Sequence, residues 1–181
     1  MNDDLRKLYK LQYQQRCSKY PDISTKDVLP EADRIIVIGD LHGDWDETIK
    51  SLQVAGVIDK KHKWIGGDTI VVQIGDQIDR CRQLPCNRKI EGDEDSDIKI
   101  LKFFTNLHSE AIKEGGAIYS VIGNHELMNS TDRMEYVSYQ NYIEFEQKPE
   151  NQEFLVGMPK DLKDMDARKW AFKPGNPLAE F

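Results

Sequence analysis

Three short motifs contain residue types that bind metal ions, and each follows a stretch of apolar, largely β-branched residues. The motifs read GDLHG at residues 39–43, GDQIDR at residues 75–80 and GNHE at residues 123–126. Side chains that follow parallel strands gather at the carboxyl edge of the sheet. Carboxylate, amide and imidazole groups from all three motifs would then meet at one place. The simplest chemistry for such a set is a pair of metal ions that holds a phosphate group.

The first motif offers a carboxylate and an imidazole two residues apart. On an extended backbone, Asp40 and His42 can point to the same side and share one ion. This pair of ligand types suits manganese, iron or zinc better than calcium. A purely structural alternative stays open for this motif alone, in which Asp40 caps the following helix and His42 lies on the surface.

The other two motifs add further ligands and groups suited to phosphate chemistry. The Asp76 carboxylate has two oxygens and can bridge two metals, and Arg80 offers a fork of donors that matches phosphate oxygens. A surface ion pair with a nearby acid is the alternative for Arg80. Asn124 supplies a neutral amide oxygen, whereas the adjacent His125 points elsewhere and is better placed as an acid or base. We expect Glu126 to stabilise the backbone of its turn instead of binding metal.

In this order the three motifs resemble the signature of calcineurin-like metallophosphoesterases, and the Asp-Arg and His-Glu endings resemble the phosphoprotein phosphatase branch. Two further stretches, WIGGD at residues 64–68 and LMN at residues 127–129, are similar to the Shewanella-like phosphatases. The resemblance covers roughly residues 34–137 and, more faintly, residues 168–181.

The resemblance implies a site for two divalent metal ions, which would be manganese, iron or zinc. Asp40 and His42 would bind the first ion, and Asp76 would bridge both. Asn124 would bind the second ion and contact the phosphate. A hydroxide bound between the two metals would attack phosphorus, so that no phosphoenzyme is needed.

The resemblance also implies three catalytic residues outside the ligand set. His125 would protonate the leaving alkoxide as general acid, and Asp79 would hold its ring in orientation. Arg80 would bind the phosphoryl oxygens of the substrate. The implied function is hydrolysis of phosphomonoesters, with a phosphorylated protein as substrate.

The sequence departs from this family in its histidines. Family members complete the second metal site with two later histidines, but the four histidines here are His42, His62, His108 and His125. The second metal would keep only Asp76 and Asn124 from this chain. Two alternatives therefore stay open: a phosphoesterase for nucleotides, dinucleoside polyphosphates or other small phosphoesters, and an inactive phosphatase-like module that binds without turnover.

The pattern of apolar residues predicts an α/β fold. Buried strands are expected at residues 34–39, 69–74 and 117–122, the first of them buried on both faces. Helical spacing follows the first motif and recurs at residues 100–112, with Ser96 as a possible N-cap. Further helices are suggested at residues 5–20 and 136–145, and the polar stretch of residues 80–97 is expected to be exposed. Alternating strands and helices imply a parallel sheet.

The expected organisation is an N-terminal extension, residues 1–33, followed by a metallophosphoesterase domain, residues 34–181, that is incomplete at its C-terminus. Such a chain corresponds to the N-terminal portion of a two-sheet sandwich flanked by helices. One side of its sheet would present an apolar surface and an unpaired edge. A partner chain that completes the domain is one explanation.

Composition narrows the choice of partners and location. The 181 residues are 39% hydrophobic and 31% charged, and the formal net charge is -7 without a long basic stripe, which disfavours nucleic acid. The sequence has no apolar run near the roughly 18 residues of a membrane span and no apolar signal segment. We therefore expect a cytoplasmic protein with no membrane partner.

The three cysteines, Cys17, Cys81 and Cys86, suggest reduced thiols in a cytosol-like compartment. Cys81 and Cys86 are close enough in sequence for a local disulfide or half of a metal site, but we favour free thiols. Cys81 also replaces the glycine that usually follows Asp-Arg in the family.

Overall fold

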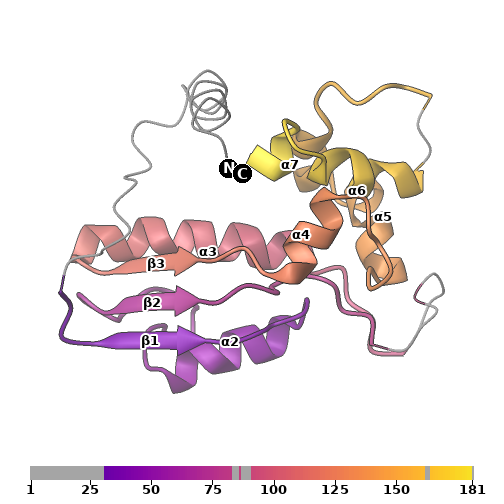
Figure 1. Ribbon diagram of the computed structural model, residues 1–181. Helices are drawn as coiled ribbons and strands as arrows, with labels where there is room; N and C mark the ends of the chain where they lie inside the picture. Colours follow the sequence, from indigo (N-terminus) through magenta and orange to yellow (C-terminus); the bar gives the residue numbers. More distant parts are fainter. Residues whose placement is uncertain (1–30, 83–85, 87–90, 162–163, 181) are drawn as a thin grey trace, which may run out of the picture. The chain divides into compact units, whose positions relative to one another are not determined.

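Within the residues that the structure describes, three parallel strands form the sheet, in the order β1 (Ile35–Ile38), β2 (Ile70–Gln73) and β3 (Ala117–Ser120). Ile36, Val71 and Ile118 lie side by side across the sheet. Figure 1 shows the three arrows side by side and pointing the same way. The prediction of a parallel α/β sheet is confirmed, and each strand is shorter than its apolar stretch.

The computed structural model describes residues 31–82, 86, 91–161 and 164–180. Residues from Ala32 onward form one unit. The helix predicted at residues 5–20 and the residue Cys17 lie outside the described residues. The division of the chain after residue 33 stays a prediction.

In the described part of the chain, two helices cover one face of the sheet. They are α2 (Trp45–Val54) and α3 (Asp97–Ala111), and α3 is continued by η1 (Ile112–Glu114). Their apolar stripes pack on the strands in a core that includes Leu52, Val71, Phe104, Leu107 and Ile118. These side chains are between 0% and 5% exposed, which indicates tight packing between the helices and the sheet.

The N-caps of these helices exclude capping by Asp40, which was the alternative to its role as a metal ligand, and they place Ser96 as predicted. Asp44, and not Asp40, is the N-cap of α2, and its side chain accepts a hydrogen bond from the Glu47 backbone N–H. Ser96 stands at the N-cap of α3 as predicted but makes no side-chain capping bond. Its hydroxyl donates instead to the carbonyl of Gly43, so that α3 is attached to the loop after β1.

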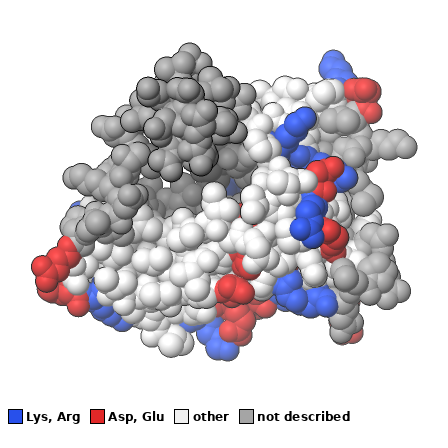
Figure 2. Space-filling view, in the orientation of Figure 1, with Lys and Arg blue, Asp and Glu red and all other residues white. Residues whose placement is uncertain are grey.

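The second face of the sheet is apolar and exposed along β1 and beyond β3. Ile35 is 59% exposed, Val37 63% and Val121 51%. The prediction of an exposed apolar side is thus confirmed, whereas burial of β1 on both faces is wrong, because within the described residues helices pack on the opposite face. In Figure 2 the described surface around the strands carries few charged groups.

A helical region follows β3. It comprises α4 (Asn124–Ser130), α5 (Tyr139–Gln147), η2 (Pro149–Leu155), α6 (Asp164–Phe172) and α7 (Pro177–Glu180). A second core joins this region to the loop after β2 and to α3, through Ile78, Ile98, Phe145, Ala171 and Phe172. The predicted helix at residues 136–145 corresponds to α5, which starts three residues later. Within the part of the chain that the structure describes, no helix is both long and apolar enough to cross a membrane.

Candidate active site

The loops after β1 and β2 are joined by backbone hydrogen bonds. The N–H groups of Leu41 and His42 both donate to the carbonyl of Asp76, at 2.9 Å each. Gly43 N–H donates to the carbonyl of Gln77 at 2.8 Å. The first two motifs are therefore in direct contact, at the carboxyl ends of their strands.

Glu126 joins the third motif to the second. Its carboxylate accepts hydrogen bonds from the backbone N–H groups of Asp76 (2.9 Å), Gln77 (2.8 Å) and Gly123 (2.8 Å). This confirms the prediction that Glu126 stabilises the backbone of the turn. Charge-assisted bonds of this kind are stronger than neutral ones, so the three motifs form one connected unit.

Several residues of this unit adopt a backbone conformation that is unfavourable for them. His42, Asp76 and Asp79 have φ angles of 49°, 53° and 71°. Such left-handed conformations cost of the order of 1–3 kcal/mol each and are concentrated at functional sites. Gly123 is also required here, because a Cβ atom at that position would collide with the Asp76 carboxylate.

A candidate metal site lies where the loops meet. His42, Asp76 and His125 each offer one ligand atom, and these atoms lie within 4.8 Å of one another. The two imidazole rings are 4.8 Å apart and arranged edge to face. His42 Nε2 also lies 3.4 Å from the Asp40 carboxylate. This donor set of imidazoles and carboxylates fits manganese, iron or zinc.

The group overlaps with the predicted ligand set of Asp40, His42, Asp76 and Asn124. Asp40 has an exposed side chain next to His42, and Asn124 begins α4 with an exposed side chain. His125, predicted to act apart from the metals, is a member of the compact group. The ligand assignment therefore stays a prediction for these residues.

The ring of His125 is held by Asp79. Its Nδ1 lies 2.9 Å from Asp79 Oδ2, which leaves Nε2 as the available ring nitrogen. This hydrogen bond raises the pKa of His125 above its ordinary value of 6.5. The His125 backbone N–H donates to the Asp76 carboxylate at 2.9 Å. The pair has the geometry of an imidazole whose tautomer is fixed by a carboxylate.

Asp79 belongs to a fully buried group of charged residues, which we call the Arg168 cluster: Asp79, Asp97, Glu144 and Arg168. Arg168 donates from Nη2 to Asp79 (3.2 Å) and to Asp97 (2.8 Å), and from Nη1 to Glu144 (3.3 Å). Burial raises the pKa of Asp97, and it raises the pKa of Glu144 well above the ordinary value of 4.5. The single guanidinium faces three carboxyl groups.

Arg80 points to acidic side chains in this structure. Its guanidinium pairs with Asp44 at 2.6 Å and Glu94 at 3.1 Å, and its Nε donates to the carbonyl of Gly92. This matches the ion-pair alternative that the sequence left open. Binding of phosphoryl oxygens by Arg80 stays a prediction.

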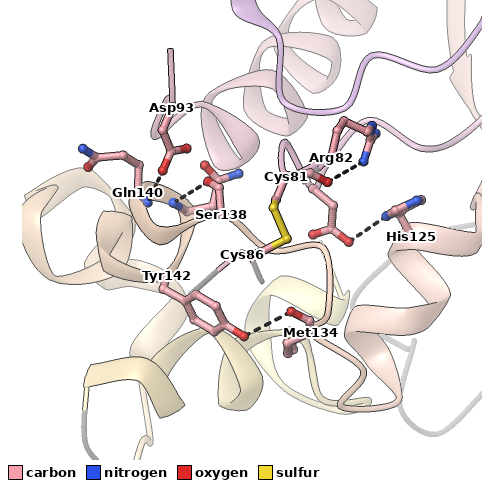
Figure 3. Close-up of a disulfide and its surroundings, with 11 residues drawn as sticks. Cys81, Arg82, Cys86, Asp93, His125, Met134, Ser138, Gln140 and Tyr142 are labelled. Carbon is pink, nitrogen blue, oxygen red and sulfur yellow. Dashed lines mark hydrogen bonds and ion pairs between the residues drawn. A yellow bond between two sulfur atoms is a disulfide. The ribbon is translucent and has the colours of Figure 1, made fainter. Parts of the chain in front are cut away.

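Cys81 and Cys86 form a disulfide, with Cα atoms 5.7 Å apart (Figure 3). The preference for free thiols at these two positions is therefore wrong. The side chains are 0% and 6% exposed, and the Arg82 side chain donates to the Cys81 carbonyl. The disulfide thus begins at the residue that directly follows Arg80. The cytoplasmic location stays a prediction, which these two cysteines no longer support.

Sequence reasoning gave no role to Asn129, Asp97, Glu144 or Arg168. Asp97 closes an acidic run that was expected to be exposed, but it is fully buried. The available signal for Arg168 was its position among Ala167, Ala171 and Phe172, which form the buried stripe of α6.

Comparison with known proteins agrees with this geometry. The family model for calcineurin-like phosphoesterases matches residues 33–173. The chain belongs to the calcineurin-like phosphoesterase family. The resemblance read from the three motifs is confirmed.

Among curated proteins, the chain is similar to Shewanella-like protein phosphatase 2 of Arabidopsis thaliana, with 39% identity over 124 residues. That match covers 68% of this chain and 28% of the relative. It is also similar to Shewanella-like protein phosphatase 1 of Plasmodium berghei, with 32% identity over 105 residues that cover 58% of this chain and 25% of the relative. The chain thus spans about a quarter of the length of these relatives.

Solved structures show the same fold. A cold-active protein tyrosine phosphatase superposes with a TM-score of 0.58 at 19% identity, over 84% of this chain and 38% of that protein. The cold-active protein tyrosine phosphatase of a psychrophilic Shewanella species gives a TM-score of 0.53 at 20% identity, over 80% and 40%. The expected α/β fold is confirmed, and the chain corresponds to part of these larger proteins.

Proposed function

We propose that this chain carries the metal-binding and proton-transfer residues of a phosphomonoester hydrolase that acts on phosphorylated proteins. The observation that carries the proposal is the convergence of His42, Asp76 and His125, with Asp79 behind the His125 ring. The names of the relatives, which are protein phosphatases, favour a phosphoprotein as substrate.

Asp40, His42, Asp76 and Asn124 are the residues that we assign to two divalent metal ions. The imidazole and carboxylate donors fit manganese, iron or zinc. Divalent cations bound there supply neutralisation of the phosphate charge and lower the pKa of a water molecule. The left-handed backbone of His42 and Asp76 supports their assignment, because strain of this kind is retained where function requires it.

His125 is assigned to proton transfer. Water forms a bond to phosphorus as the bond from phosphorus to the ester oxygen breaks, and Nε2–H donates its proton to that ester oxygen. The products are inorganic phosphate and a neutral alcohol. Asp79 accepts from Nδ1 and stabilises the protonated ring, which is the form that must be present before the transfer. Protonation is favoured because the pKa of His125 is raised.

Arg80 is our candidate for binding the phosphoryl oxygens. Its ion pairs with Asp44 and Glu94 hold the guanidinium beside the loop after β1. An anionic substrate would compete with these two carboxylates for the same donors. The planar fork of the guanidinium matches two phosphoryl oxygens.

A second candidate is a binding module without turnover. It is favoured by the ion pairs of Arg80 with Asp44 and Glu94, which occupy the guanidinium that would otherwise bind the phosphoryl oxygens. Such a module would bind divalent metal and a phosphorylated partner but would leave the phosphoester intact.

The test is a hydrolysis assay of the purified chain with manganese, iron or zinc. The substrates are 4-nitrophenyl phosphate, phosphopeptides with phosphoserine, phosphothreonine or phosphotyrosine, and a dinucleoside polyphosphate. We expect metal-dependent release of phosphate, fastest from a phosphopeptide, that is abolished by Asp76→Asn. Metal binding without any hydrolysis would support the second candidate, the binding module. Turnover by Asp76→Asn equal to that of the wild-type chain would refute the mechanism.

A further inference from the structure

We propose that Arg168 is a positioning residue of this site, which acts through Asp79 to hold His125 in the orientation for proton transfer. The proposal deepens the function proposed above and rests on it for the role of His125. It makes α6 part of the active site through Arg168, which lies 89 residues after Asp79 in the sequence.

The contacts of Arg168 leave its guanidinium little freedom. The side chain is 0% exposed. Its Nε donates to Asn129 Oδ1 at 2.8 Å, Nη1 donates to the Asn141 carbonyl at 3.2 Å and to Glu144 at 3.3 Å, and Nη2 donates to Asp79 and Asp97. All three nitrogens of the fork are therefore bonded, and the plane of the guanidinium is fixed.

Asp79 is held through both of its carboxylate oxygens. Its Oδ1 accepts from Arg168 Nη2 at 3.2 Å and from Asn129 Nδ2 at 3.0 Å. Its Oδ2 accepts from the same amide nitrogen at 2.8 Å and faces His125 Nδ1 at 2.9 Å. Because a carboxylate is planar, donors on both oxygens determine where Oδ2 points and hence where the imidazole lies.

Asn129 completes the connection between the two residues. Its Oδ1 accepts from Arg168, while its Nδ2 donates to Asp79 and to the His125 carbonyl at 3.0 Å. Arg168 therefore reaches Asp79 by two routes, one direct and one through the Asn129 amide.

Charge gives a second reason for an arginine at this position. Among the described residues, Arg168 is the only lysine or arginine that is buried. It faces Asp79, Asp97 and Glu144, and an unpaired carboxylate at such depth is strongly destabilising. A lysine would keep the positive charge but would lose the planar fork. The substitution Arg168→Lys therefore keeps the charge compensation and removes the positioning by the planar fork, so its effect measures positioning.

The first experiment measures how each variant depends on the leaving group. The phenolate of phenyl phosphate needs a proton from the general acid in order to leave. The 4-nitrophenolate of 4-nitrophenyl phosphate is a much weaker base and leaves readily without one. Since general acids contribute about 10²–10⁴-fold, partial misplacement in Arg168→Lys should lower kcat on phenyl phosphate by about tenfold. On 4-nitrophenyl phosphate the loss should stay below about twofold, with KM little changed.

Leu52→Ala is the matched structural control. Leu52 is 0% exposed in the core between α2 and the sheet, away from the Arg168 cluster. Its truncation destabilises the fold and should lower both rates in the same proportion. An unchanged ratio of the two rates in Arg168→Lys would overturn the positioning role.

A second measurement does not depend on turnover. In the wild-type protein, proton NMR should show a slowly exchanging downfield resonance from His125 Nδ1–H, assigned by its loss in His125→Gln. We expect this resonance to vanish or to exchange rapidly in Arg168→Lys. If it does so in a chain that hydrolyses no substrate, the positioning inference stands and the proposed function fails. If the resonance is unchanged in Arg168→Lys, the inference fails.

A charge-matched variant replaces Arg168→Lys if that protein does not fold. The double substitution Arg168→Met with Asp97→Asn removes one buried charge of each sign and does not replace Asp79 or His125. It should show the same loss of the resonance and the same selective loss on phenyl phosphate. Retention of both would count against the proposal.

Discussion

The site depends at the residue scale on what each ring nitrogen of His125 contacts. Nδ1 lies against the Asp79 carboxylate, and the backbone N–H of the same residue donates to Asp76. His125 is thus fixed by two aspartates of one loop, although it follows them by nearly 50 residues. The residue belongs to the compact group with His42 and Asp76, and we place the substrate beside this group, within reach of Nε2.

We predict that His125→Gln slows hydrolysis by about 10²–10⁴-fold, the usual contribution of a general acid. The variant should keep most of its divalent metal, because our ligand set does not include His125. Steady-state rates and metal content by mass spectrometry test both parts. Loss of metal in proportion to activity would instead make His125 a ligand, as its place in the compact group allows.

Glu144 gives a prediction about stability and pH. Burial raises the pKa of this residue well above its ordinary value of 4.5, so the folded state holds the proton more tightly than the unfolded state. The corresponding stability is fully present below about pH 4.5 and is lost as pH rises through the folded pKa. Glu144→Gln cannot ionise, so its stability relative to wild type should increase as pH rises from 4.5. Urea unfolding at several pH values measures this, and a constant difference between the two proteins would contradict it.

At the scale of elements, the disulfide constrains the segment that leaves the active-site loop. Cys81 lies directly after Arg80, and its backbone N–H donates to the carbonyl of Tyr136. The disulfide closes a short loop from Cys81 to Cys86, and the backbone hydrogen bond attaches the end of the second motif to the turn before α5.

We predict that Cys81→Ala with Cys86→Ala lowers the free energy of unfolding by about 2 kcal/mol, the amount expected for a short closed loop. Denaturant unfolding of oxidised protein measures the change. Alkylation followed by mass spectrometry checks the premise, because Cys81 and Cys86 should react only after reduction. Modification of both thiols without a reductant would show that the bond does not form.

The local elements could largely be predicted from sequence, because their signals lie within single segments. The strands at residues 35–38, 70–73 and 117–120 each fall inside a predicted apolar run. The role of Glu126 followed from its place in a turn. These features depend on neighbours in the chain, where periodicity and turn chemistry are informative.

The Arg168 cluster could not be predicted in the same way. Its partners are separated by 24 to 89 residues in the sequence. Asp97 ends an acidic run and so resembles a surface position, whereas Arg168 follows Ala167 on the apolar stripe of α6. The stripe of α6 indicates that Arg168 faces a core, but the carboxylates that it meets there are decided by which elements pack together, and local sequence patterns do not encode that.

At the scale of the whole molecule, one side of the sheet presents an exposed apolar surface. Ile35, Val37 and Val121 place apolar side chains there, each more than half exposed. The partner chain that the sequence analysis allowed for would cover this face, and it stays a prediction. An apolar face of this kind otherwise favours association.

We predict that the isolated chain binds a hydrophobic dye such as ANS through this face. Val37→Thr combined with Val121→Thr should lower the dye fluorescence while secondary structure by circular dichroism stays the same. Val54→Thr is the matched control, since Val54 is 83% exposed at the end of α2, outside the sheet. Equal fluorescence in all three proteins would place dye binding elsewhere.

The central claim is that His42, Asp76 and their neighbours hold divalent metal where the three motifs meet. The most direct measurement is the manganese bound per chain after dialysis, compared between wild type and Asp76→Asn. We predict at least one tightly bound ion in wild type and at least about tenfold weaker binding in the variant. Substitutions of residues that only support metal ligands already weaken metal binding about 10–100-fold, so loss of a ligand should weaken it at least tenfold. Wild-type protein that binds no ion, or a variant that binds as tightly, would contradict the account.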